Sequence, residues 1–372
     1  MPFDCRHRRE FGPEACLSSC PAAPPVFDVV RVRCPDDLPP ADPGLIDVAV
    51  LDMHLGWPNL GHGAILQAMQ NAVCDISGAL MRTGIGFRAL SYDVRRGLVM
   101  PAPPGGRHLL YVGTGGPGHL DPRMNDGRSE GSQGILEDPS WEPRLFEVFD
   151  AIRASRTAAL LSVCHTFGVM CRWLGAADAV LRGPEKGGKS TGIVENILTD
   201  EALAHPWFAR FSEALPDRRR LYSLDNRLYD LVPRGAWPAG LTAISHEALG
   251  PRGPRGEALT MMEVARDEAG VMPRILGVNH HPEIVNRTRL LVTLEQEFAR
   301  GDVSQAWYDE RRATLTEPVA DERGDRLIHL TSSYTFMGPL RFHLYKLARL
   351  RGEELGRPLG LDETSLPLTY TL

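Results

Sequence analysis

The chain has 372 residues, of which 43% are hydrophobic and 24% are charged, so its composition is that of an ordinary globular protein. Its net charge is −6 and no apolar run reaches the length of a bilayer span. We therefore expect neither a nucleic acid nor a membrane among its partners.

Residues 1–44 are rich in proline and cysteine, with Pro-Pro pairs at 24–25 and 39–40. These pairs predict an irregular N-terminal arm rather than a packed domain. The first residues carry no apolar run behind their charges, which is not the pattern of a secretory signal. We therefore expect a cytoplasmic protein in which the seven cysteines are reduced thiols.

The cysteines of the arm raise the question of a zinc site. Cys5, Cys16, Cys20 and Cys34 lack the closely paired spacing of common zinc sites. We expect structural thiols there, and no metal or other cofactor.

From residue 45 onward, strands and helices alternate. Buried strands are predicted at 45–53, 87–94, 108–112 and 157–163, and shorter ones at 192–198, 241–245, 258–265 and 274–278. Helical spacing is found at 65–80, 143–152, 167–174, 291–300 and 340–351. This alternation predicts an α/β domain with a mostly parallel sheet covered on both faces, followed by a helical C-terminal extension over 301–372.

Three segments place reactive groups where predicted strands end, which is where such groups gather in open parallel sheets. Gly115-Gly116-Pro117-Gly118 follows one strand, and its glycines let the backbone approach a ligand closely. Cys164 lies between a strand and a helix, where the helix dipole favours a thiolate. The third segment ends in His281-Pro282-Glu283, an imidazole with a carboxylate two residues later.

In this order, the glycine loop, the cysteine elbow and the His-Pro-Glu segment resemble the class I glutamine amidotransferases. The resemblance covers roughly residues 45–290. It implies a flavodoxin-like, doubly wound amidotransferase-like domain over 45–300. It also implies glutamine, or a related amide, as the substrate.

The resemblance implies a role for each matching residue. Cys164 would attack a carboxamide carbon, His281 would relay the proton, and Glu283 would orient His281. The N–H groups of Gly116 and His165 would form an oxyanion hole. Weaker substrate contacts are expected from three neighbours: Gly115, Thr166 and His280. Released ammonia would pass to a separate synthetase subunit.

Two departures from the family pattern leave other activities open. The elbow has Ser162 and Thr166 where glycines are usual, and the glutamine that follows the cysteine in the family is absent. One alternative is a hydrolase or acyl transferase acting on another substrate, such as an amidase or γ-glutamyl hydrolase. A second alternative is a catalytically silent binding or regulatory subunit on the same fold.

Other features have both an ordinary and a functional interpretation. The stretch 183–190 matches the G-x4-G-K-[ST] pattern of a phosphate-binding loop. That loop needs a strand before it and a helix after it, whereas here we expect an Ala-rich helix end before it and a strand after it.

We expect residues 119–140 to form a long loop that covers the site. A pocket role is open for His54, for His62 and for Asp225–Arg227. The basic helix at 340–351 is expected to pack on its own domain or to form a homodimer contact.

Overall fold

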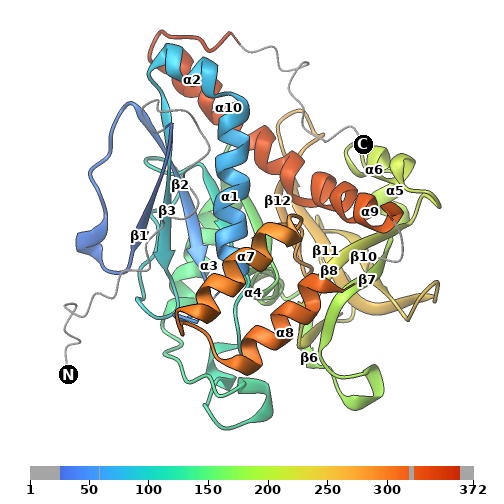
Figure 1. Cartoon of the computed structure of the whole chain (residues 1–372). Helices are drawn as coiled ribbons and strands as arrows, with labels where there is room; N and C mark the ends of the chain where they lie inside the picture. The colour runs from blue at the N-terminus through green and yellow to red at the C-terminus, as the bar shows by residue number, and fades with distance from the viewer. Residues whose placement is uncertain (1–25, 58, 318–321, 361–372) are drawn as a thin grey trace.

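The computed structural model of the chain describes residues 26–57, 59–317 and 322–360 (Figure 1). Its centre is a sheet of ten strands in the order β1-β3-β2-β4-β5-β12-β11-β10-β7-β8. Cys5, Cys16 and Cys20 of the N-terminal arm lie outside the described residues.

The first six strands of this order are parallel. They are β1 (Phe27–Val32), β3 (Gly86–Asp93), β2 (Leu45–Asp52), β4 (Leu110–Gly113), β5 (Ala159–Val163) and β12 (Pro273–Val278). When the edge strand β1 is set aside, the remaining parallel strands lie in the order β3-β2-β4-β5-β12. If these five strands are numbered by their order along the chain, the order in the sheet is 2-1-3-4-5. This is the flavodoxin order, in which ligands bind at the carboxyl ends of the strands.

The other four strands extend the sheet in antiparallel fashion. They are β11 (Arg255–Arg266), β10 (Thr242–Ala248), β7 (Ser190–Leu198) and β8 (Arg220–Arg227). A separate ribbon pairs β6 (Ala177–Leu181) with β9 (Tyr229–Pro233). The predicted α/β fold with a large, mostly parallel sheet is therefore confirmed, and the antiparallel half is added by hairpin-like returns that the alternation did not indicate.

Helices cover both faces of the parallel half. One face carries α1 (Leu60–Asp75), α2 (Ser77–Thr83) and α10 (Gly338–Glu354), and the other carries α3 (Trp141–Ala154) and α4 (His165–Leu174) (Figure 1). The remaining helices are α5 (Asp200–Leu203), α6 (Phe208–Ala214), α7 (Arg287–Ala299), α8 (Gln305–Thr316) and α9 (Glu322–Ser332).

The strand sequences dictate these two layers. Val48 and Val50 of β2 point into the core shared with α1 and α10, while Ala49 and Leu51 point into the core shared with α3 and α4. Successive side chains of a strand alternate between faces, so a continuous apolar run is needed where both faces are covered. None of the described helices is long and apolar enough to cross a membrane.

The interpretation of residues 1–44 as irregular is wrong for 27–32, which form β1 and pair with β3. The proline pairs bracket this strand instead of interrupting it, because proline removes a donor only at its own position. The helical C-terminal extension is present, but α10 is not peripheral: Leu340 and Leu344 are fully buried against the main sheet. A one-turn π-helix at Ser333–Met337 joins α9 to α10.

We expect α10 to be required for the stability of the whole sheet. Leu344→Ala should lower the free energy of unfolding by about 2–5 kcal/mol, because it leaves a cavity in the shared core. Urea unfolding measures this change, with Leu249→Ala as the control, since Leu249 is 55% exposed. Equal unfolding midpoints for the two variants would contradict the role given to α10.

Candidate active site

Cys164 occupies the sharp turn from β5 into α4. Its backbone has φ 50° and ψ −105°, a conformation that residues other than glycine rarely adopt. The Cys164 N–H donates to the Val278 carbonyl at 2.7 Å, and its own carbonyl accepts from the Gly168 N–H at 3.0 Å. Such backbone strain is a feature of functional turns, and here the surrounding strands hold it in place.

Thr166 takes the place of the glycine that glutamine amidotransferases have after the cysteine. The turn at Cys164 has room for its side chain because the neighbouring strand has a glycine, Gly113, at the point of contact. A Cβ on Gly113 at the end of β4 would lie 2.2 Å from the Thr166 methyl group. The Thr166 hydroxyl donates to the Thr114 carbonyl at 2.7 Å, and Thr166 is fully buried. Thr166 therefore packs beneath the elbow and does not line the cavity, contrary to the predicted substrate contact.

His281 and Glu283 meet beside this turn. The imidazole Nδ1 of His281 lies 2.9 Å from Oε1 of Glu283, and both residues are buried. Gly61 at the start of α1 lets that helix approach, since a Cβ there would lie 2.7 Å from the same carboxylate oxygen. Nε2 of His281 makes no hydrogen bond to an acceptor or donor among the described residues, so it is available to a reacting group.

The charge of this pair is set by its neighbours. Burial opposes protonation of His281, but the Glu283 carboxylate and the Cys164 sulfur outweigh it, and the pKa of His281 is raised well above its usual value. The imidazolium form of His281 is therefore favoured beside the sulfur of Cys164.

The glycine loop lies directly against both groups. A Cβ on Gly115 would lie 3.1 Å from Cε1 of His281 and 3.7 Å from Sγ of Cys164, so the position has room only for a small residue. A Cβ on Gly116 would lie 2.2 Å from the Met53 carbonyl oxygen. The N–H groups of Gly116 and His165 donate to no acceptor within the described part of the chain, as an oxyanion hole requires.

A buried ion pair supports this loop from below. The Arg95 guanidinium lies 2.6 Å from Glu137 and donates to the carbonyls of Met53 and Pro117, each at 2.8 Å. Asn125 donates to the same Glu137 carboxylate at 2.9 Å. Residues 119–140, predicted to be a loop that covers the site, are thus held by an internal network, and Leu120 and Gln133 of this segment line the cavity.

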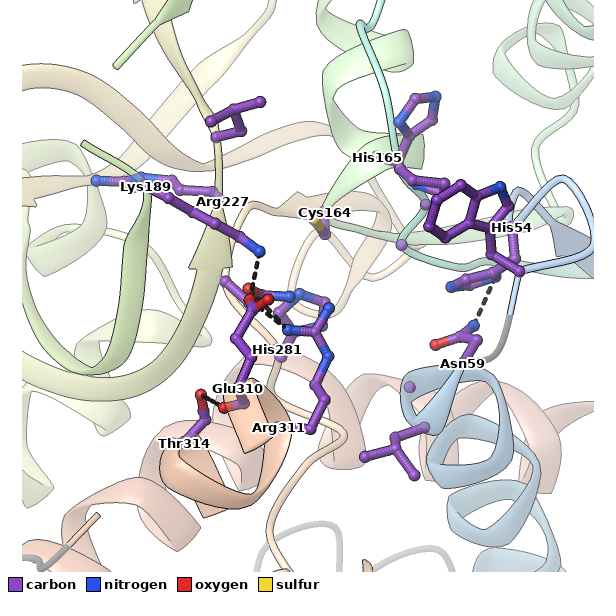
Figure 2. A pocket seen from close by; sticks show the side chains of 18 of the residues that line it. His54, Asn59, Cys164, His165, Lys189, Arg227, His281, Glu310, Arg311 and Thr314 are labelled. Atoms are coloured by element: carbon purple, nitrogen blue, oxygen red, sulfur yellow. Dashed lines mark hydrogen bonds and ion pairs between the residues drawn. The ribbon is translucent and has the colours of Figure 1, made fainter. Parts of the chain in front are cut away.

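The cavity around Cys164 is lined by residues from distant parts of the chain (Figure 2). The parallel half contributes His54, Gly115, Gly116, Cys164, His165 and His281, and the 119–140 segment contributes Leu120 and Gln133. The antiparallel half contributes Lys189, Asn226 and Arg227. A further wall comes from α8, with Trp307, Glu310, Arg311, Thr314 and Leu315.

Some residues singled out in the sequence lie elsewhere. His280 is 1% exposed, its Nε2 lies 3.3 Å from the Thr335 hydroxyl, and burial lowers its pKa to about 3. It is therefore part of the core and not a substrate contact as predicted, because its chain neighbour His281 takes the cavity side. His62 is likewise buried, with Nε2 2.8 Å from the Ser91 hydroxyl.

The phosphate-loop pattern at 183–190 lies between two strands, β6 and β7. The helix end predicted before it is wrong, since β6 stands there, and the predicted strand after it is confirmed. Without a helix behind it, this loop lacks the aligned N–H groups that bind phosphate. Its Lys189 nevertheless lines the cavity, and so do Asn226 and Arg227 of the segment whose role was left open.

Among the described residues, no group of three or more histidine, cysteine, aspartate or glutamate side chains is arranged to hold a metal ion. The contribution of α8 to the cavity is the feature that the sequence did not indicate. Its residues lie more than 20 positions beyond the last motif, and nothing in their spacing distinguishes a cavity wall from a surface helix.

The fold and the site together define an α/β protein with a Cys–His–Glu arrangement at the carboxyl edge of a flavodoxin-like sheet. No family model matches the chain, and no curated protein matches it. Similar solved structures include a glutamine amidotransferase from Thermotoga maritima, at 15% identity and TM-score 0.44, covering 81% of this chain and 97% of that one.

Two further solved structures are similar to this chain. SMU.1228c has 13% identity and TM-score 0.44, covering 81% of this chain and 99% of that one. A protein from Thermoplasma acidophilum described as part of a GMP synthase has 12% identity and TM-score 0.37, covering 64% of this chain and 85% of that one. At these identities the likeness concerns the fold alone, and the chemistry of the site follows from its geometry.

We expect Glu283→Gln to lower the pKa of His281. The neutral amide removes the charge that stabilises the imidazolium, while burial still disfavours it. NMR titration of the His281 ring measures this shift. Glu268→Gln is the control, because Glu268 is exposed in the turn between β11 and β12 and does not line the cavity. An unchanged titration of His281 in Glu283→Gln would contradict the electrostatic role of Glu283.

Proposed function

We propose that this protein hydrolyses a carboxamide through a thioester on Cys164, in the manner of a glutamine amidotransferase. The observation that carries the proposal is the convergence of three elements on one cavity. These are the strained Cys164 turn, the His281–Glu283 pair, and the unused N–H groups of Gly116 and His165.

In the first half-reaction, the Cys164 thiolate attacks the amide carbon, and the carbonyl oxygen takes up negative charge. The N–H groups of Gly116 and His165 are the proposed donors to this oxygen, each worth about 3–4 kcal/mol of barrier. The C–N bond then breaks, and protonated His281 gives its proton to the nitrogen. Ammonia leaves and an acyl thioester remains.

In the second half-reaction, a water molecule attacks the thioester carbon and His281 accepts a proton from it. The bond between carbon and sulfur breaks, which returns the thiolate and releases a carboxylic acid. Glu283 keeps His281 oriented throughout, and its charge favours the imidazolium that forms in each step. In this proposal the ammonia serves a separate synthetase subunit, and glutamine is the first substrate to test.

A second candidate is hydrolysis of a larger amide, such as a γ-glutamyl compound. One observation favours it: the cavity lining includes the large apolar side chains of Trp57, Trp307 and Leu315. Trp57 is 46% exposed, so its ring is accessible to a bulky leaving group.

Covalent labelling of Cys164 by a glutamine-shaped diazoketone tests the proposal. We expect labelling that is faster than with a small generic alkylator, that free glutamine slows, and that Cys164→Ala abolishes. Intact mass measures the labelling. This measurement does not need a partner protein to be present.

The other outcomes separate the alternatives. Fast reaction with the generic alkylator alone indicates an activated thiolate with a substrate other than glutamine. If both reagents react no faster than with an ordinary thiol, the catalytic proposal is wrong and a silent binding role takes its place.

A further inference from the structure

A cluster of charged side chains lies in the cavity wall formed by β7 and α8. Nζ of Lys189 lies 2.5 Å from Oε1 of Glu310, and Nη1 of Arg311 lies 2.8 Å from the same oxygen (Figure 2). Arg311 also donates to Asn226 at 3.3 Å and stacks over the Trp307 ring at 5.4 Å. We call Lys189, Glu310 and Arg311 the α8 cluster.

The α8 cluster has an excess positive charge, because two cations share one carboxylate. Burial opposes ionisation of Glu310, but Lys189 and Arg311 outweigh it and lower its pKa, so Glu310 is an anion. Glu310 is the sole aspartate or glutamate among the described residues that line the cavity. The excess runs against the net charge of −6 of the whole chain.

The third cation of the cavity, Arg227, is already neutralised. It donates to Glu247 at 2.8 Å and lies 3.4 Å from Asp225 and 3.3 Å from Asp230. Arg182 and Lys186 also bind Asp230, at 2.6 and 2.9 Å. The negative charges of the three carboxylates are therefore balanced by the positive charges of Arg227, Arg182 and Lys186. The unbalanced charge therefore belongs to Lys189 and Arg311.

Both cations have donors to spare. An ammonium has three N–H groups and a guanidinium has five. Within the described residues, only Glu310 and Asn226 accept from Lys189 and Arg311. Lys189 is 29% and Arg311 22% exposed, so their remaining N–H groups are accessible from the cavity that Cys164 also lines.

We propose that Lys189 and Arg311 form a subsite for a carboxylate at the end of the substrate remote from the scissile amide. Glu310 holds the side chains of Lys189 and Arg311 in place through its hydrogen bonds with both. Its carboxylate oxygens would also accept a hydrogen bond from an ammonium group next to the carboxylate of the substrate. The inference rests on the proposed function and adds to it the side chains that would hold the carboxylate, which come from outside the flavodoxin-like core. It also makes α8 part of the substrate site.

The test compares two diazoketones on the full chain: the glutamine-shaped reagent and its carboxyl methyl ester, which lacks the negative charge. We expect Cys164 to react at least about tenfold faster with the acid, since hydrogen bonds between charged groups are the strong ones. Arg311→Met and Lys189→Met should each reduce this preference severalfold. Each rate is divided by the iodoacetamide rate of the same variant, so that a change in the thiol itself does not alter the comparison.

Arg312→Met is the matched control, because Arg312 is the exposed neighbour on α8, loses the same charge and does not line the cavity. It should keep the wild-type preference. The subsite would be overturned if the acid and the ester label Cys164 at equal rates, both faster than they label an ordinary thiol. The proposed function would stand in that case.

If Cys164 reacts like an ordinary thiol with every reagent, the proposed function fails and binding is measured instead. Glutamine should then raise the Tm of Cys164→Ala, and the glutamine methyl ester should not. Addition of Arg311→Met should remove the shift, whereas addition of Arg312→Met should keep it. Absence of any shift that depends on Arg311 would overturn the subsite on this measurement too.

Discussion

The positive φ angle of the Cys164 backbone is the constraint on which the site depends. A residue with a side chain occupies this conformation only when its surroundings fix it. The surroundings here are β12, whose Val278 carbonyl accepts the Cys164 N–H, and β4, whose Gly113 leaves space for Thr166. Three neighbouring parallel strands thus set the direction of one thiol.

The same geometry explains why the loop after β4 consists of small residues. Gly116 lies against the Met53 carbonyl, and Arg95 binds that carbonyl together with Pro117. Arg95 and Glu137 are both fully buried at their side chains, so neither charge is tolerable without the other. The ion pair therefore fixes the position of the glycine loop that lines the cavity.

The cavity is completed by elements that do not belong to the flavodoxin-like core. Strand β8 brings Asn226 and Arg227, the loop before β7 brings Lys189, and α8 brings Glu310 and Arg311. The core thus places the proposed reacting groups at strand ends, while the additions supply most of the charged side chains around them. This division separates the proposed chemistry from the selection of a substrate.

The sequence by itself determined five of the six parallel strands, and it placed Cys164, His281 and Glu283 at strand ends, because these features follow from local apolar runs and adjacent residues. It did not determine the edge strand β1 or the antiparallel half, since strand pairing depends on partners far along the chain. Only the tertiary structure placed His280 in the core and Lys189 in the cavity wall. The physical reason is the same in each case: which way a side chain faces is decided by what packs against its backbone.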